Sequence, residues 1–402
     1  MHVGRGNLDI LAPETHINAW PLYTKLREET PLYFDEVNKV WIVSRYDDIC
    51  KLSKMPAIFT SAEGNRPNLP GDESFICKDG HAHTSRRALV AARFGPKAIN
   101  KMEEHIRDAV VDLLDNAPAS PCEFVESVAA PLPMKIIGEM CGIPAEYHDD
   151  VRHWMDIFMT GGNGPDHVTM EVNEAFMNFG ALHFQLADER RENPKDDLLS
   201  LWLNAEIDGL PYNDDQLLFE HTMMMIGGSE TSRNAITGGL EMLIRDPAQA
   251  EFLKENPEWI PNAFEEMTRW VTPFISMSRT ATQDYDGLYD TVIKEGEELM
   301  FLYPAANREP EKFPNPNTFD VRRDFSSIKP IAFGYGPHFC IGARLARMEG
   351  KVLFEELLKR WTDLRIESDP EWAVSSFIRG ITRFEIGYTP IEGRGRHAMA
   401  SK

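Results

Sequence analysis

The chain has few cysteines and none of the long apolar runs that a membrane segment needs. Its five cysteines, Cys50, Cys77, Cys122, Cys141 and Cys340, form an odd and widely spaced set. They show neither a disulfide rhythm nor paired metal-ligand spacing, and such usage is typical of a reducing compartment. No apolar run approaches the roughly 18 residues of a spanning helix. The first twenty residues also lack the basic and apolar regions of a signal peptide, so we expect a cytoplasmic protein.

Positive charge is also scarce. The 42 basic residues against 64 acidic ones give a formal net charge of −22, which argues against nucleic acid as a partner because phosphate binding needs an electropositive face. The basic residues are nevertheless unevenly spread, and Arg344, Arg347 and Lys351 follow Cys340 closely. Taken alone, such a cluster is typical of a solvated helix face.

Most of the sequence has the periodicity of amphipathic helices. It predicts helices over residues 20–31, 214–245 and 343–361, and the branched and aromatic residues of 39–46 predict a strand. Residues 271–330 contain many turn formers, which indicates short strands and a proline-rich irregular segment. No internal repeat or low-complexity linker divides the chain. The pattern predicts a mainly α fold with a smaller β region.

Residues 332–349, AFGYGPHFCIGARLARME, surround one cysteine with glycines and aromatics and then enter a predicted helix. Glycines packed this densely indicate sharp turns or close approach to something large or flat. Free amides at the start of the helix can stabilise a thiolate. A lone cysteine is usually a small buried hydrophobic residue, so its surroundings decide how it is interpreted.

Phe333, Gly336, His338, Cys340 and Gly342 fit the pattern F-x-x-G-x-[RH]-x-C-x-G. This loop resembles the haem-binding loop of the cytochrome P450 superfamily. The resemblance implies that the Cys340 sulfur is the axial thiolate ligand of haem iron, with Phe333 packed beside it and His338 reaching a haem propionate. The glycines, Gly342 among them, would let the loop lie close to the porphyrin and point amides at the sulfur.

A second motif lies in FEEMTRW, where Glu266 and Arg269 stand three residues apart on a predicted helix. Alone, this spacing describes an ordinary surface ion pair. It also resembles the family's E-x-x-R motif. The resemblance implies that Arg323, in FDVRR, supplies a second arginine to the same glutamate, and that the three form a buried triad that supports the haem loop.

A third motif interrupts the predicted helix over 214–245 with two glycines. Each costs about 1 kcal/mol relative to alanine in a helix interior, so the pair indicates either close helix packing or a local distortion. Gly227, Gly228, Glu230 and Thr231 also resemble the family's oxygen-activation motif, [AG]-G-x-[DE]-T. That resemblance makes Glu230 and Thr231 a catalytic pair that relays protons through ordered water, with glutamate in place of the aspartate common in bacterial members.

A fourth patch, HAHTSRRALV, places His83 and Arg87 on one face of a helix. His81 and His83 alone lack the further ligands that a zinc site requires. The resemblance instead assigns His83, Arg87 and Arg279 to the haem propionates, where cations meet carboxylates. The sequence DGHAH departs from the family here, because many bacterial relatives have a proline pair before the histidine.

The resemblance runs from about residue 20 to 391. It implies one cytochrome P450 domain over 1–402, with haem b between two central helices and with 392–402 as a disordered tail. It further implies a haem-thiolate monooxygenase that hydroxylates an unactivated C–H bond with O2 and two electrons. A ferredoxin and an NAD(P)H-dependent ferredoxin reductase would supply these electrons. Arg86, with the basic cluster after Cys340, is then expected to form a docking face for an acidic ferredoxin.

The sequence indicates the substrate less clearly than the cofactor. Segments that line the substrate pocket in relatives correspond to 64–76, 224–228, 272–277 and 377–381. The C-terminal half is similar to bacterial members that oxidise sterol side chains and terpenoids, which favours a lipophilic steroid, terpenoid or fatty-acyl compound. Met223, Met224 and Met225 are expected mainly to fill the core, with one methionine facing the cavity. The predicted pocket residues are Met224, Gly227, Gly228, Phe274, Ile275, Met277, Phe377 and Ile381.

Three other functions compete with this interpretation. A peroxygenase driven by hydrogen peroxide needs no electron partner, but such relatives usually lack the acid and alcohol that Glu230 and Thr231 provide. A non-catalytic haem sensor would need no proton relay. A zinc hydrolase would need H-E-x-x-H or a comparable ligand spacing, which the sequence lacks.

Overall fold

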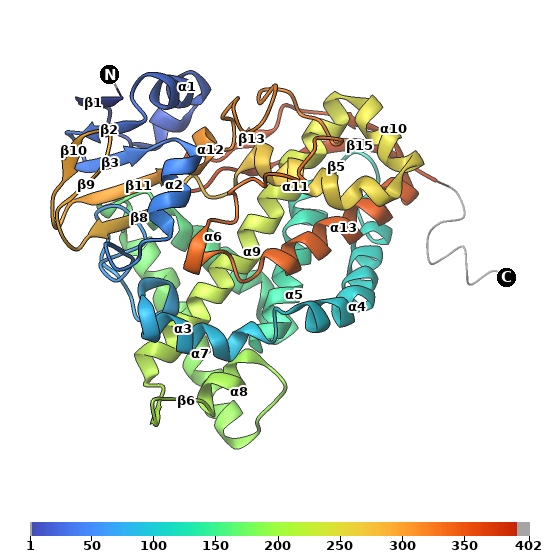
Figure 1. Ribbon diagram of the computed structural model, residues 1–402. Helices are drawn as coiled ribbons and strands as arrows, with labels where there is room; N and C mark the ends of the chain where they lie inside the picture. The colour runs from blue at the N-terminus through green and yellow to red at the C-terminus, as the bar shows by residue number, and fades with distance from the viewer. Residues whose placement is uncertain (1, 392–402) are drawn as a thin grey trace.

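The chain forms a helical body with a β region at one side (Figure 1). The computed structural model describes residues 2–391, and the predicted tail over 392–402 lies outside them. The mainly α architecture with a smaller β region is confirmed. The helices are α1 Trp20–Glu29, α2 Tyr46–Ser53, α3 Gly80–Ala91, α4 Pro96–Asp115, α5 Pro131–Cys141, α6 His148–Gly161, α7 Met170–Glu192, α8 Leu198–Leu203, α9 Asp214–Arg245, α10 Pro247–Glu255, α11 Ile260–Val271, α12 Tyr303–Ala306 and α13 Ala343–Arg360.

The β region is built on a six-stranded sheet in the order β1-β2-β3-β11-β8-β4. Most neighbours in it are antiparallel, while β1 pairs with β2, and β3 with β11, in parallel. The strands of the chain are β1 Val3–Gly6, β2 Leu32–Asp35, β3 Val40–Val43, β4 Phe59–Thr60, β5 Cys122–Glu123, β6 Glu206–Ile207, β7 Leu210–Pro211, β8 Ser276–Ala281, β9 Tyr285–Leu288, β10 Thr291–Ile293, β11 Glu298–Leu302, β12 Trp361–Ile366, β13 Glu371–Trp372, β14 Ile381–Arg383 and β15 Glu385–Pro390.

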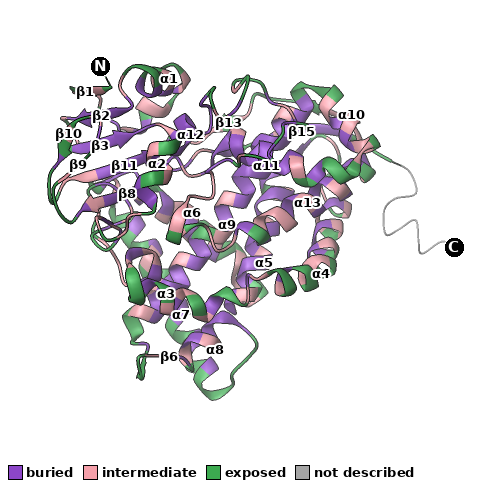
Figure 2. Cartoon of the chain, viewed as in Figure 1, coloured by how far each residue is buried: buried purple, intermediate pink, exposed green. Residues whose placement is uncertain are grey.

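Helix α9 runs through the middle of the helical body and is buried along most of its length (Figures 1 and 2). Its start is fixed by a capping box, in which Asn213 accepts from the backbone of Gln216 and the Gln216 side chain accepts from the backbone of Asn213. The helix has the bounds that the sequence predicts, and it continues without a break through the glycine pair. The unbroken helix therefore fixes the positions of the side chains that it carries.

The other predicted elements differ from the structure only at their ends. The helix predicted over 20–31 ends at Glu29, two residues before Pro31, and the strand predicted over 39–46 is β3, Val40–Val43. Trp361, predicted as the last helical residue, begins β12 instead. Within residues 2–391, every helix is too short or too polar to span a lipid bilayer.

Candidate active site

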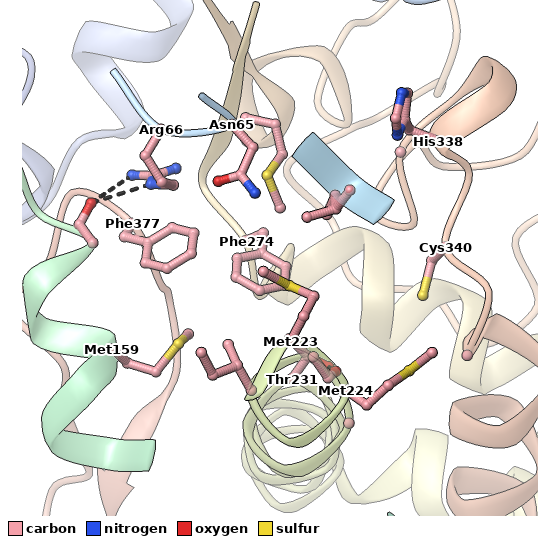
Figure 3. Close-up of a pocket in the computed structure, with 18 of the residues that line it drawn as sticks. Asn65, Arg66, Met159, Met223, Met224, Thr231, Phe274, His338, Cys340 and Phe377 are labelled. Carbon is pink, nitrogen blue, oxygen red and sulfur yellow. Dashed lines mark hydrogen bonds between the residues drawn. The ribbon is translucent and has the colours of Figure 1, made fainter. Parts of the chain in front are cut away.

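A cavity of about 700 Å³ lies between α9 and the start of α13. The loop that carries Cys340 forms one side of it. The other sides of the cavity are formed by residues 65–77, the end of α6 and the segment around Phe377. Figure 3 shows Cys340 at one side of this space, with Thr231 and Met224 projecting from α9 and with Arg66 and Phe377 at the opposite side. One cavity therefore receives side chains from distant parts of the sequence.

The Cys340 loop is held tightly against its surroundings. The Cys340 amide donates to the Phe333 carbonyl at 2.8 Å. Gly336 has φ +74°, and a Cβ there would lie 2.5 Å from the Ser53 carbonyl oxygen at the end of α2, so only glycine fits without strain. Burial raises the pKa of the Cys340 thiol, and the Gly342 amide and the charges of Arg87 and Arg347 oppose this. The Cys340 sulfur therefore lies where nearby amides and positive charges favour a thiolate against the effect of burial.

Four donor side chains gather on the same side of the cavity as Cys340. Arg87, Arg279 and His338 line the cavity, and the His83 ring lies 4.1 Å from the His338 ring. His338 Nε2 contacts Asp79 and Ser61, but His338 Nδ1 and His83 Nε2 are buried with no hydrogen-bond partner. Burial lowers the pKa of His83 to about 4.

The two arginines of this group also lack an anionic partner. Arg87 donates to the Phe339 carbonyl and Arg279 to the Ser278 carbonyl, and no carboxylate within residues 2–391 pairs with either. Burial lowers the pKa of Arg279 because the charge is removed from water. Unsatisfied donors and uncompensated cations that converge in this way fit a ligand that carries carboxylates.

The catalytic pair predicted on α9 is divided between two faces of the helix. Thr231 lines the cavity, and its hydroxyl donates to the Gly227 carbonyl at 2.9 Å. Glu230 points away from the cavity and accepts from Arg233 at 2.6 Å. Consecutive residues of an α-helix project about 100° apart, and here that rotation carries the Glu230 side chain out of the cavity lining while Thr231 stays in it. A direct contact between the acid and the alcohol is not present in this structure.

Glu230 instead belongs to a chain of charges that leads outward. Arg233 also donates to Asp156 of α6 at 2.9 Å, and the Asp156 side chain is 36% exposed. Burial raises the pKa of the Glu230 carboxyl above its ordinary value, and Arg233 opposes this. A carboxyl whose pKa is raised in this way can take up and release a proton closer to neutral pH, so this chain of charges links solvent to the back of α9.

The two glycines of α9 have different surroundings. A Cβ on Gly228 would lie 2.5 Å from Ile137 of α5, whereas a Cβ on Gly227 would meet no described atom within 4 Å. Gly228 therefore permits close helix packing. Gly227 leaves open space in the cavity beside Thr231.

Glu266, Arg269 and Arg323 meet in the core of the protein. Arg269 donates to Glu266 at 2.6 and 2.7 Å, and Arg323 donates to the same carboxylate at 3.0 Å. Both Glu266 and Arg269 are fully buried. The arginines also donate to backbone carbonyls at Asn307, Pro314, Pro316 and Thr318. The triad therefore fastens α11 to the irregular segment that precedes the loop.

Six of the eight predicted pocket residues line the cavity, namely Met224, Gly227, Gly228, Phe274, Met277 and Phe377. Ile275 and Ile381 do not. Ile275 packs in a core cluster with Ile10 and Met300, and Ile381 packs in the core of the helical body. Both lie on or beside strands, where neighbouring side chains point to opposite faces, and the sequence does not indicate which face turns inward.

Sequence reasoning missed part of the lining. Phe158 and Met159 of α6, Phe176 of α7 and Phe219 of α9 all reach the cavity, and Met223 joins Met224 in it, while Met225 fills the core as expected. Phe158 and Phe176 stack at 5.7 Å, and Phe176 and Phe219 at 5.6 Å. The only signal in the sequence is an apolar helix face, which equally describes an ordinary core.

The predicted docking face is smaller than expected. Arg86 is only 8% exposed, donates to the Glu73 carbonyl and lies 3.7 Å from Glu220, so it cannot meet a partner protein. Arg347 is paired with Glu265, and Lys351 with Glu103 at 2.8 Å. Arg344 is exposed.

Comparison with known proteins agrees with this arrangement. The family model described as cytochrome P450 matches residues 149–372. Steroid C26-monooxygenase of Mycobacterium tuberculosis is 35% identical over 92% of this chain and 93% of its own length. Methyl-branched lipid omega-hydroxylase of Mycobacterium bovis is 33% identical over 96% of this chain and 94% of its own length.

Solved structures show the same likeness. CYP109E1 from Bacillus megaterium in complex with testosterone superposes with a TM-score of 0.86 at 28% identity, covering 93% of this chain and 99% of that one. A mutant of P450 EryK in complex with erythromycin B gives 0.86 at 26% identity, covering 95% and 98%. Since family model, relatives and structures all agree across most of its length, this chain belongs to the cytochrome P450 family and is a haem-dependent monooxygenase.

Proposed function

We propose that the protein uses haem b, held by the Cys340 thiolate, to hydroxylate an unactivated C–H bond of a lipophilic small molecule of the steroid, terpenoid or fatty-acyl type. The observation that carries this proposal is the cavity itself. Cys340 and a group of unpaired donors lie at one side of it, and apolar side chains such as Phe274, Met277 and Phe377 form much of the remaining lining. The steroid and methyl-branched lipid substrates in the relatives' names support the substrate class.

The residues at the Cys340 side fit haem. Cys340 would supply the thiolate that holds the iron, and Phe333 and Gly342 line the cavity with it. His83, Arg87, Arg279 and His338 would hold the propionates, since His83 Nε2 and His338 Nδ1 lack partners and the arginines lack anions. The sequence has no C-x-x-C-H motif for covalent attachment, which favours haem b.

Haem held in this way supplies the activation of dioxygen, from which one oxygen atom enters the substrate. The chain's own residues supply protons and exclude water. We assign proton uptake to Glu230, which Arg233 and Asp156 connect to solvent, and delivery inside the cavity to the Thr231 hydroxyl. Because the two side chains face different sides of α9, transfer between them needs a bridging water or a rotation of the Glu230 side chain.

We further propose that the protein works in the cytoplasm as one domain. A ferredoxin and an NAD(P)H-dependent ferredoxin reductase would supply the electrons. All five cysteines are free, which fits a reducing compartment. The exposed Arg344 at the start of α13 marks the place beside the Cys340 loop where an acidic ferredoxin would dock.

The test begins with a carbon monoxide difference spectrum of the reduced protein. A strongly red-shifted Soret band supports thiolate ligation by Cys340, and a band typical of histidine-ligated haem contradicts it. Steroids, terpenoids and branched fatty acids are then incubated with ferredoxin, reductase and NAD(P)H, or with hydrogen peroxide alone. Oxygenated product in the first mixture supports the proposed electron supply. Product only with peroxide indicates a peroxygenase, and binding without any product indicates a sensor.

A further inference from the structure

Arg66 places a buried guanidinium group at the side of the cavity opposite Cys340 (Figure 3). The residue is only 5% exposed. Its Nε and Nη2 donate to the Gly162 carbonyl at 3.1 and 2.9 Å, and its Nη1 donates to the Ser276 carbonyl and hydroxyl at 2.5 and 3.2 Å. All of these acceptors are neutral.

The positive charge of Arg66 has no counterion in the part of the chain that the structure describes. Most buried arginines near the site do have one: Arg269 and Arg323 pair with Glu266, and Arg233 pairs with Glu230. Burial lowers the pKa of Arg66 to about 9. A buried charge without a counterion is costly, so this side of the cavity favours an anion.

Within residues 2–391 two carboxylates line the cavity, and neither fills this role. Asp72 accepts from the backbone of Ser74 at 2.7 Å, and Glu73 pairs with Lys78 at 3.0 Å. The haem cannot fill it either, since the donors assigned to the propionates, such as Arg87 and Arg279, gather on the Cys340 side. Arg66 is thus the cavity-lining arginine that neither the protein nor the cofactor accounts for.

The guanidinium group is also held in a fixed position. The Phe377 ring lies beneath it, with its centroid 3.7 Å from the guanidinium carbon. A Cβ on Gly162 would overlap that ring, so the glycine lets the Phe377 ring and the Gly162 carbonyl both reach Arg66. Of the five guanidinium N–H groups, one on Nη2 remains without an acceptor. A preorganised donor loses little conformational entropy when it binds a ligand.

We propose that Arg66 binds the carboxylate of the substrate, and that the substrate class is therefore a lipophilic carboxylic acid. This inference rests on the proposed function, and it adds the orientation of the substrate in the cavity. Between Arg66 and Cys340 lie apolar side chains, among them Phe274 and Phe377, whose rings are 4.9 Å apart. A molecule anchored at Arg66 places its hydrocarbon end toward Cys340, so oxidation falls on carbons remote from the carboxylate. A neutral hydroxyl or ketone would accept a hydrogen bond but would leave the charge uncompensated.

The experiment compares dodecanoic acid with 1-dodecanol, which have the same chain length, as ligands of the haem-loaded protein by isothermal titration calorimetry. Hydrogen bonds to charged groups contribute about 1.5–3 kcal/mol, so we expect the wild type to bind the acid at least about tenfold more tightly. Arg66→Gln should bind both probes with similar affinity, and Arg66→Lys should keep part of the preference because it retains the charge but loses the fork.

Arg308→Gln is the matched control. Arg308 is likewise buried without a carboxylate partner in the described chain, and it stacks 3.3 Å from the Trp20 ring centroid, but it does not line the cavity. Its substitution should leave the acid-to-alcohol ratio at the wild-type value. Equal affinity of the wild type for both probes would overturn the proposal, as would an unchanged ratio in Arg66→Gln with full haem content. If Arg66→Gln does not fold, the acid-to-alcohol affinity ratios of the wild type and of Arg66→Lys still test the proposal.

The two proposals fail in different ways. If the acid is preferred through Arg66 but no oxygenated product forms with electrons and O2, the proposed monooxygenase function fails and the anchor stands. If products form from neutral steroids and alcohols as readily as from acids, the function stands and the anchor fails. Hydroxylation of dodecanoic acid in the half of the chain nearest the carboxylate would also contradict the direction assigned to the substrate.

Discussion

Glu266→Gln tests how much the buried triad contributes to the stability of the protein and to haem retention. The substitution keeps the size of the side chain but removes the only negative charge between Arg269 and Arg323. Glu266 and Arg269 are fully buried, so solvent cannot screen the two positive charges that remain. Removing one partner of a buried ion pair costs about 3–5 kcal/mol.

This free energy converts into a measurable change in melting temperature. Unfolding entropy is about 2.1 cal/mol/K per residue, which for a chain of 402 residues gives about 0.8 kcal/mol per kelvin. A loss of 3–5 kcal/mol therefore lowers Tm by about 4–6 °C. Because the triad fastens residues 307–323 ahead of the Cys340 loop, haem content should fall as well.

The assay is differential scanning fluorimetry, together with the ratio of Soret to protein absorbance for haem content. Glu251→Gln is the matched control, since Glu251 and Lys254 have the same spacing on α10, at 3.5 Å, but Glu251 is 63% exposed. Exposed pairs of this kind contribute about 0–1 kcal/mol, so this variant should melt within about 1 °C of the wild type. Similar losses in the two variants would refute the reasoning from burial.

The other predictions concern α9 and the helix that follows the Cys340 loop. Gly228→Ala should cost about 1–3 kcal/mol by overpacking against Ile137, whereas Gly227→Ala should not lower Tm and should instead weaken substrate binding. Equal Tm values would contradict the packing of α9. Thr231→Ala should lower the product formed per electron and raise peroxide release in O2-uptake assays, and unchanged coupling would exclude the proposed role of its hydroxyl. Burial raises the pKa of Glu349 to about 8 in the folded protein. Because this pKa lies above the value in the unfolded chain, the protonated carboxyl favours the folded state. The stability that it contributes is lost as the pH rises from about 5 to 8. Glu349→Gln should therefore gain Tm relative to the wild type as the pH rises from 5 to 9, and a constant difference would contradict this.

Much of the fold and the site follows from local spacing. The capping residues and apolar period of 214–245 determine a helix with those bounds, because both signals act within a few turns. The glycines around Cys340 predict a tight loop, and Gly336 does adopt a positive φ. The resemblance to the family implies that Glu266, Arg269 and Arg323 meet, and the structure brings them together.

Where sequence reasoning fell short, the outcome depended on which way a side chain faces. Glu230 and Thr231 are neighbours in the motif, yet helix geometry turns them to different faces. Arg86 belongs to a basic stretch, yet it lies buried between Glu73 and Glu220. Composition does not distinguish a solvated charge from a buried one, because burial is decided by the segments that pack on top.

The elements, the family motifs and the haem-ligand candidates can be predicted from the amino-acid sequence alone, since each motif consists of residues close together along the chain. The surroundings of the substrate depend instead on how distant segments pack. Arg66 meets acceptors 96 and 210 residues away, at Gly162 and Ser276, and its charge matters because that packing buries it without bringing a carboxylate of the described chain to it. Such an environment is a property of three distant segments together, so no single stretch of sequence could have indicated it.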